Sequence, residues 1–117
     1  MRQVESDQLR VNWADSLRAA YEYGEVLVTT FHDEPAGVLM SREKWAQGVQ
    51  RLPVEESLQI VLNSREARTK LRAQREGLRR GKHTIVTLWN EERAVLAPYQ
   101  WAVQAFPDLE LPAPAPS

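Results

Sequence analysis

The chain has 117 residues, of which 43% are apolar and 26% charged, a composition typical of a globular domain rather than a disordered chain. It contains no cysteine, which excludes disulfides and thiolate metal sites and fits a reducing, cytoplasmic setting. No apolar run approaches the roughly 20 residues that a membrane helix needs, and residues 1–7 lack the pattern of a signal peptide. We therefore expect a cytoplasmic protein that does not bind membranes.

The net charge of −1 hides a separation of charge along the chain. Residues 1–60 carry six bases and ten acids, a net charge of −4, whereas residues 61–97 carry nine bases and four acids, a net charge of +5. A basic segment beside an acidic one favours either a polyanionic partner or self-association between opposite charges. The charge pattern alone does not distinguish the two.

The first half of the chain predicts a strand, a helix, a hairpin and a second helix. Gly24 ends the first helix, because glycine tolerates the positive φ at which helices commonly stop. The predicted elements are a strand at residues 2–5, a helix from Ser6 or Asp7 to about Tyr23, strands at 26–31 and 36–40 around a turn at 32–35, and a helix capped by Ser41.

The second half predicts the same order of elements. Asn63 and Glu66 have the spacing of a capping box, and Gly81 ends the helix that they begin. The predicted elements are a strand at residues 59–62, a helix at 64–80, strands at 84–88 and 93–97 around a turn at 89–92, and a final helix that starts at Pro98.

These two halves form an internal repeat. A constant offset of 57 residues places Gly24 on Gly81, Thr30 on Thr87 and Val38-Leu39 on Val95-Leu96. Each copy is too small to bury a core alone, so the copies must pair. The expected organisation is a first repeat at residues 1–52, a second at 53–106, and a proline-rich flexible tail at 107–117.

Arginines gather on the helix predicted at residues 64–80. They advance by three and four positions, so a continuous helix places them within about a quarter of its circumference. The five are Arg65, Arg68, Arg72, Arg75 and Arg79. Guanidinium groups bind phosphate oxygens in pairs, so the stripe favours contact with a nucleic-acid backbone, and the alternative is a solvated helix face.

Residues suited to catalysis are sparse. His32 and His83 occupy different positions in the two copies and lack a metal-ligand spacing, so both are expected to be surface histidines. Without a phosphate-binding loop or a nucleophile elbow, we expect no enzyme, no metal and no cofactor. Of the four tryptophans, Trp13, Trp45 and Trp101 lie on apolar helix faces and predict core packing, whereas Trp89 falls in a turn and predicts an interface contact.

At these residues the chain resembles the prevent-host-death (Phd/YefM) antitoxin family, and it does so twice. The first copy carries Gly24-Glu25, Val28-Thr29-Thr30, Pro35, Val38-Leu39-Met40-Ser41 and Trp45, and the second carries Ser64-Arg65-Glu66-Ala67-Arg68, Leu71, Gly81, Val86-Thr87 and Ala94-Val95-Leu96. The resemblance implies an α+β fold of two Phd/YefM-like units (short strand, helix, β-hairpin, helix) that pair through a shared antiparallel sheet as an intrachain pseudo-dimer.

The resemblance also implies a function, that of a DNA-binding transcriptional regulator in a type II toxin–antitoxin system. Operator DNA and a cognate toxin are the implied partners, and a homodimer of the pseudo-dimeric chain is expected on the operator. The implied DNA-binding residues are Arg65, Arg68, Arg72 and Arg75, with Arg10 as the weaker counterpart in the first copy.

The chain departs from the family pattern in three places. Phe31 and Leu88 stand where an arginine often follows the strand threonine, Val11 stands at the helix-start arginine of the first copy, and the tail is short. Two alternatives therefore stay open. The chain is a protein-interaction module that neutralises a toxin such as a ribonuclease without binding DNA, or residues 1–50 form a conventional dimerising domain while residues 54–117 bind the toxin.

Overall fold

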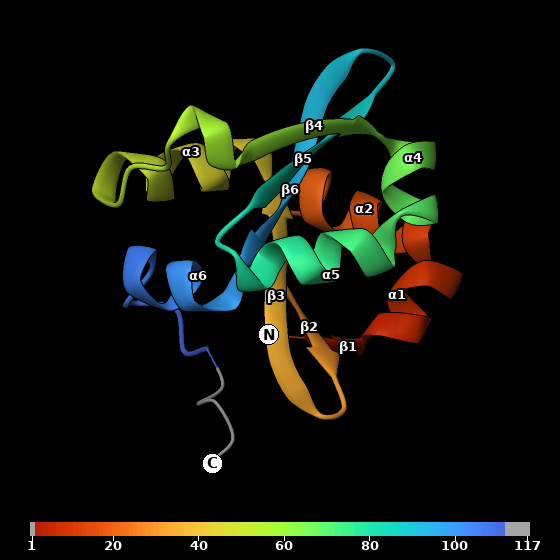
Figure 1. The fold of residues 1–117 in the computed structure, drawn as a ribbon, viewed down its shortest axis with the longest axis horizontal. Helices are drawn as coiled ribbons and strands as arrows, with labels where there is room; N and C mark the ends of the chain where they lie inside the picture. Colours follow the sequence, from red (N-terminus) through yellow and green to blue (C-terminus); the bar gives the residue numbers. More distant parts are fainter. Residues whose placement is uncertain (1, 112–117) are drawn as a thin grey trace.

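The computed structural model describes residues 2–111 and shows an α+β fold, in which helices cover both faces of one six-stranded mixed sheet (Figure 1). In the first half the elements are β1 (Arg2–Glu5), α1 (Ser6–Val11), α2 (Trp13–Tyr21), β2 (Leu27–Phe31), β3 (Glu34–Ser41) and α3 (Arg42–Arg51). In the second half they are a 3₁₀ turn η1 (Glu56–Leu58), β4 (Gln59–Asn63), α4 (Ser64–Thr69), α5 (Leu71–Arg79), β5 (His83–Leu88), β6 (Glu91–Pro98) and α6 (Tyr99–Ala105).

The strand order is β1-β2-β3-β6-β5-β4, so each half contributes three adjacent strands. The outer pairs, β1 with β2 and β4 with β5, are parallel, and the hairpins and the central pair are antiparallel. A parallel pair needs a crossover connection, which the helices between these strands provide. The sheet is therefore mixed rather than wholly antiparallel.

The two halves meet at β3 and β6. Leu39 lies opposite Leu96, its equivalent at an offset of 57 residues. On either side of this pair, Val38 lies opposite Ala97 and Met40 lies opposite Val95. Val38 is equivalent to Val95 and Met40 to Ala97, so exchanging the two halves converts one pair into the other, as a two-fold axis does. We call this central pair of strands the seam. It joins the halves by backbone hydrogen bonds within one continuous sheet.

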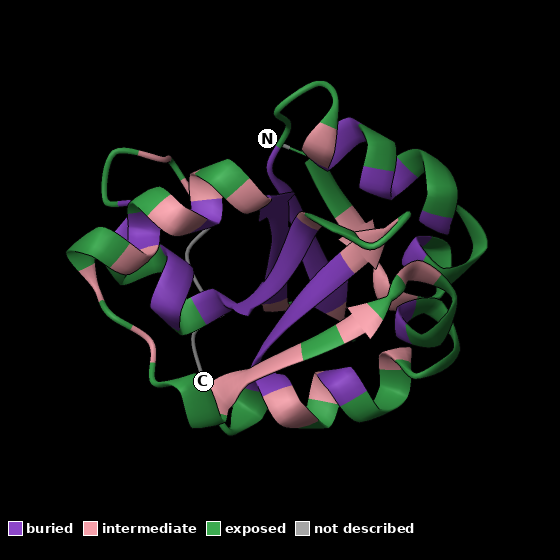
Figure 2. Ribbon diagram, turned by 90° about the horizontal axis from the view of Figure 1, so that it is seen from above, coloured by how far each residue is buried: buried purple, intermediate pink, exposed green. Residues whose placement is uncertain are grey.

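The sheet separates two apolar clusters, and its strands carry much of the buried surface (Figure 2). α3 and α6 cover one face, where the cluster contains Val28 and Ile85, and these two equivalent residues are buried in one core as the repeat predicts. α1, α2, α4 and α5 cover the other face, whose cluster contains Leu39 and Leu96. Both clusters draw residues from both halves, so neither half has a complete core of its own.

Each long helix expected before the hairpins is broken into two. The breaks fall at Asn12, with φ −105° and ψ 34°, and at Lys70, with φ −102° and ψ 25°. After the second break, the side-chain amide of Gln74 donates a hydrogen bond to the carbonyl of Ala67. The prediction of continuous helices at residues 6–23 and 64–80 is therefore wrong, because the backbone turns so that both short pieces can reach the sheet.

The positions of the breaks also correct the repeat alignment. Asn12 and Lys70 are 58 residues apart, whereas the strands of the hairpins align at 57. The extra residue lies between α2 and β2, since Arg2 pairs with Leu27 while Gln59 pairs with His83. The offset is therefore 58 from β1 to α2 and 57 from the hairpin onward, and not constant.

The glycine stops and the Ser41 cap are as expected, whereas the hairpin turns are shorter than the predicted four residues and Pro98 ends β6, so the last helix starts at Tyr99. Gly24 and Gly81 have φ of 67° and 80°, and the Ser41 side chain caps α3. Both hairpins turn tightly on two residues of positive φ, namely His32-Asp33 and Trp89-Asn90. In the C-terminal segment Leu109 and Leu111 pack against the core, and residues 112–117 of the predicted tail lie outside the described part of the chain.

The seam gives a first prediction. Leu39 is fully buried between the halves, so Leu39→Ala removes apolar contact and leaves a cavity, at a cost of about 2–5 kcal/mol in the free energy of unfolding. Urea denaturation followed by circular dichroism measures this cost. Val103→Ala, at a residue 38% exposed on α6, is the control and should change the free energy by less than about 1 kcal/mol. A similar small loss for Leu39→Ala would contradict the seam as a shared core.

Candidate nucleic-acid interface

α4 directly contacts α1 through Arg10 and the start of α2 through Trp13. The Arg68 guanidinium Nε donates a hydrogen bond of 3.1 Å to the carbonyl oxygen of Arg10. The Trp13 indole donates to the backbone oxygen and to Oγ of Ser64, at 3.1 and 3.0 Å. These three helices frame a broad surface depression, which we call the basic cleft. It is lined by Arg10, Val11, Trp13, Ala14, Ser64, Arg65, Arg68 and Thr69.

Local sequence fixes the orientation of α4. Asn63 accepts a hydrogen bond from the backbone amide of Glu66, and the Glu66 side chain accepts one from the amide of Asn63. Ala67 is fully buried and holds the inner face of this helix against the sheet. Arg65 and Arg68 lie on other faces of the turn and are exposed. The capping box therefore fixes the start of the helix that presents both arginines.

Arg10 and Arg68 are equivalent residues at the corrected offset of 58. The alignment from sequence alone placed Val11 at this position, which is wrong because the extra residue lies further along the chain. The basic cleft thus contains the same arginine from each half. The symmetry ends there, since the equivalents of Arg65 and Arg72 are Asp7 and Ala14.

The remaining arginines diverge after the break at Lys70. Arg72 is exposed and lines a small cavity together with Arg10. Arg75 is partly buried, and its guanidinium carbon lies 3.6 Å from the centroid of the Phe31 ring. Arg79 is exposed and reaches Glu76 at 3.9 Å. The expectation of one arginine line along a single helix is therefore wrong. Arg10, Arg65 and Arg68 line the basic cleft, and Arg72 and Arg75 line a small cavity with Arg10 and Asp7.

The guanidinium groups of the basic cleft are not engaged in ion pairs within the described residues. Within residues 2–111, none of the ion pairs shorter than 4.0 Å involves Arg10, Arg65, Arg68 or Arg72. The Glu66 carboxylate nearby is directed to Lys70, 4.0 Å away, and to the capping box. Exposed guanidinium groups without a carboxylate partner are suited to binding phosphate oxygens.

His83 departs from its expected surface position. It is 2% exposed at the start of β5, where its Nδ1 accepts a hydrogen bond of 2.9 Å from the Trp45 indole and its ring meets that of Trp101 edge-on at 4.7 Å. Burial lowers the pKa of His83 to about 4. The surface expectation for His83 is therefore wrong, whereas His32 is exposed. The available signal was the alternation of β5, which places His83 on the same face as Ile85.

This histidine gives a second prediction. The unfolded chain binds a proton at His83 near pH 6.5 and the folded chain only near pH 4, so its contribution to stability is present above pH 6.5 and is lost as the pH falls toward 4. His83→Gln should reduce the loss of unfolding free energy between pH 7 and 5 by about 2 kcal/mol, because each pH unit between the two pKa values is worth about 1.4 kcal/mol. Urea denaturation at the two pH values measures the difference, and His32→Gln is the control. Equal pH slopes in parent and His83→Gln would contradict the assignment.

The four tryptophans fall into two groups, three in the core and one in a turn, as the sequence predicts. Trp13, Trp45 and Trp101 are at most 9% exposed, which confirms their place in the core. Trp89 is 83% exposed at the tip of the second hairpin, where its φ is 49°. Few residues other than glycine, asparagine and aspartate adopt such a backbone. Trp89 thus remains available for contact with a partner.

Neither a metal centre nor a membrane span is found in the described part of the chain. Residues 2–111 contain no cluster of three or more histidine, cysteine or acidic side chains placed to hold a metal ion. No helix among them is both long and apolar enough to cross a membrane. The chain matches no known protein-family model, no curated protein and no solved structure. Functional inference therefore depends on the geometry of the fold and of the basic cleft.

Proposed function

We propose that the protein is a cytoplasmic, non-enzymatic, antitoxin-like DNA-binding regulator of transcription in a type II toxin–antitoxin system. In this proposal the two halves are Phd/YefM-like units that pair as an intrachain pseudo-dimer. The observation that carries it is the meeting of the equivalent residues Arg10 and Arg68 on one exposed face. A regulator built from two like units is expected to present the same DNA-binding residue from each unit beside the axis that relates them.

The sheet supports the pairing of like units. The seam brings Leu39 opposite Leu96 and exchanges the neighbouring pairs, as a homodimer interface does. Each half also keeps the order strand, two short helices, hairpin and helix. These features are what the family resemblance implies for two Phd/YefM-like units in one chain.

The charge around the basic cleft supports a polyanion as the partner. Arg65, Arg68 and Arg10 surround one depression, and Arg72 extends the basic surface beside Arg10. Phosphate contacts from such a surface position a protein on a duplex, and an arginine that reaches the major groove can bind guanine.

The asymmetry of the cleft indicates how one chain binds. In the first half Asp7 and Ala14 replace Arg65 and Arg72, so only Arg10 has a basic counterpart there. One chain is therefore expected to bind strongly at one half-site only. Tight binding to an operator is expected to need two chains, joined as a head-to-head pair.

The third prediction tests DNA binding. Replacing Arg68 and Arg72 together with alanine should weaken binding to the promoter of the protein's own operon. It should also lower the slope of log affinity against log salt by about 2, because each lost phosphate contact releases about one fewer counterion. Fluorescence anisotropy with a labelled promoter duplex at several salt concentrations measures both quantities.

Arg42→Ala and Arg51→Ala are the matched controls, since both residues belong to α3 on the opposite face of the sheet. Each should leave the affinity and its salt dependence unchanged. The proposal fails if the intact protein shows no salt-dependent affinity for the promoter, or if the double variant binds as tightly as the parent.

A second candidate function is neutralisation of a protein toxin without DNA binding, and Trp89 favours it. An indole 83% exposed on a tight turn provides a large contact area at little cost in side-chain entropy, as interface tryptophans do. If promoter binding is absent, this candidate takes the place of the regulator. Co-purification of the protein with the product of the adjacent gene, and its loss in Trp89→Ala, would support it.

A further inference from the structure

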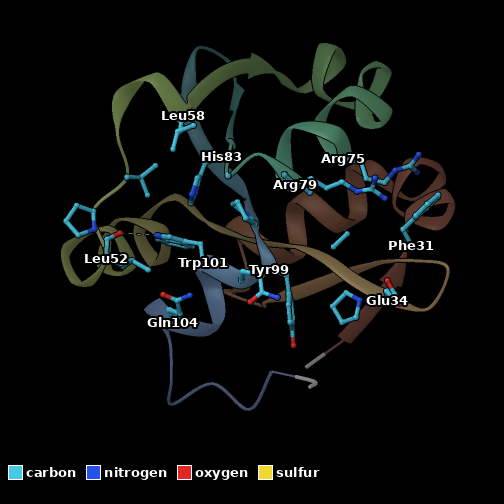
Figure 3. Close-up of a pocket in the computed structure, with 18 residues that line it drawn as sticks. Phe31, Glu34, Leu52, Leu58, Arg75, Arg79, His83, Tyr99, Trp101 and Gln104 are labelled. Carbon is cyan, nitrogen blue, oxygen red and sulfur yellow. Dashed lines mark hydrogen bonds between the residues drawn. The ribbon is translucent and has the colours of Figure 1, made fainter. Parts of the chain in front are cut away.

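A second depression is lined in part by α5 and shares no residue with the basic cleft. It is an open groove of about 570 Å³, bordered by α5, α6, the first hairpin and the segment before β4 (Figure 3). Small-molecule sites usually occupy roughly 300–1,000 Å³ and combine apolar walls with a few polar groups. The size of the groove suits a small ligand.

The groove combines an apolar floor with a cationic rim. His83, Tyr99 and Trp101 form buried parts of its lining, and Leu52 and Leu58 form partly buried parts. The pKa of His83 is lowered to about 4, so this ring is neutral near pH 7 and adds no charge to the floor. A bound molecule would therefore place an apolar body against these side chains.

The rim is formed by Arg75 and Arg79, one turn apart on α5 and therefore neighbours on the same helix face. In Figure 3 both side chains extend toward Phe31, and the Arg75 guanidinium stacks on that ring at 3.6 Å. The stacking fixes the guanidinium plane and lowers the entropy that Arg75 would lose on binding an anion.

The carboxylates near the rim do not neutralise it. Glu34 lines the same groove, yet no ion pair within 4.0 Å joins Glu34 to either arginine in the described residues. Arg79 has only the long 3.9 Å contact with Glu76, and both of those side chains are more than half exposed. An incoming carboxylate can therefore engage both guanidinium groups.

The groove is particular to the second half of the chain. At equivalent positions the first half carries different chemistry, so pairing of like units does not require these side chains. The replacements are Val26 for His83, Arg42 for Tyr99, Lys44 for Trp101 and Leu17 for Arg75. The aromatic floor and the arginine pair thus occur together in one half only.

We propose that this groove binds a small amphipathic carboxylate. The carboxylate lies between Arg75 and Arg79, and the apolar body lies along the floor toward Trp101. The groove shares no lining residue with the basic cleft, although Arg75 is also one of the arginines that the family resemblance implies for DNA binding.

The fourth prediction uses octanoate as the probe and 1-octanol as its neutral counterpart. Titration of the full chain by isothermal calorimetry should show saturable binding of octanoate and at least about tenfold weaker binding of octanol, because only the carboxylate can pair with guanidinium groups. In ¹H–¹⁵N spectra, octanoate should shift the amides of Leu58, Gly81 and Gln104 and the Trp101 indole, all of which line the groove.

Arg75→Gln and Arg79→Gln should each weaken octanoate binding by about tenfold. Arg18→Gln is the matched control, since Arg18 is an exposed arginine on α2, the equivalent helix of the first half. If Arg75→Gln unfolds in a thermal melt because it loses the Phe31 stack, Arg79→Gln decides the question. The proposal is overturned if octanoate does not bind, if octanol binds equally well, or if Arg79→Gln binds like the parent.

Discussion

The seam between β3 and β6 is the contact on which the rest of the molecule depends. Its backbone hydrogen bonds join two three-stranded halves into one sheet, and the helices of the described residues pack on the two faces of that sheet. The residues of the seam are buried on both faces, since Val38 and Val95 belong to one cluster and Leu39 and Leu96 to the other. The same pairing also brings α1 against α4 and therefore assembles the basic cleft from two distant parts of the sequence.

Much of the fold could be predicted from the sequence because its signals are local. The glycines at Gly24 and Gly81, the capping box at Asn63 and the alternating strands all specify backbone shape within a few residues. The helix breaks could not be predicted in this way. Asn12 and Lys70 are compatible with a helix, and the backbone turns there because the apolar residues on either side must reach the same sheet.

The candidate site was predictable in residue type but not in arrangement. Arg65 and Arg68 lie close in sequence, and their spacing predicts a common helix face. Arg10 becomes their neighbour only through the pairing of the halves. Its equivalence to Arg68 could not be read from the sequence, because one extra residue before β2 changes the offset between the two halves. Arg75 stacks on Phe31, which lies 44 positions earlier in the chain, and helical spacing carries no information about such a contact.

The connection from α3 to β4 has a further consequence. Residues 52–58 link the halves covalently, so the pairing at the seam is an intramolecular event with an effective concentration set by a short segment. A noncovalent dimer of like units separates on dilution, whereas these halves stay paired however scarce the protein is. The linkage also ensures that every molecule contains one acidic and one basic half, so substitutions in one half are never duplicated in the other.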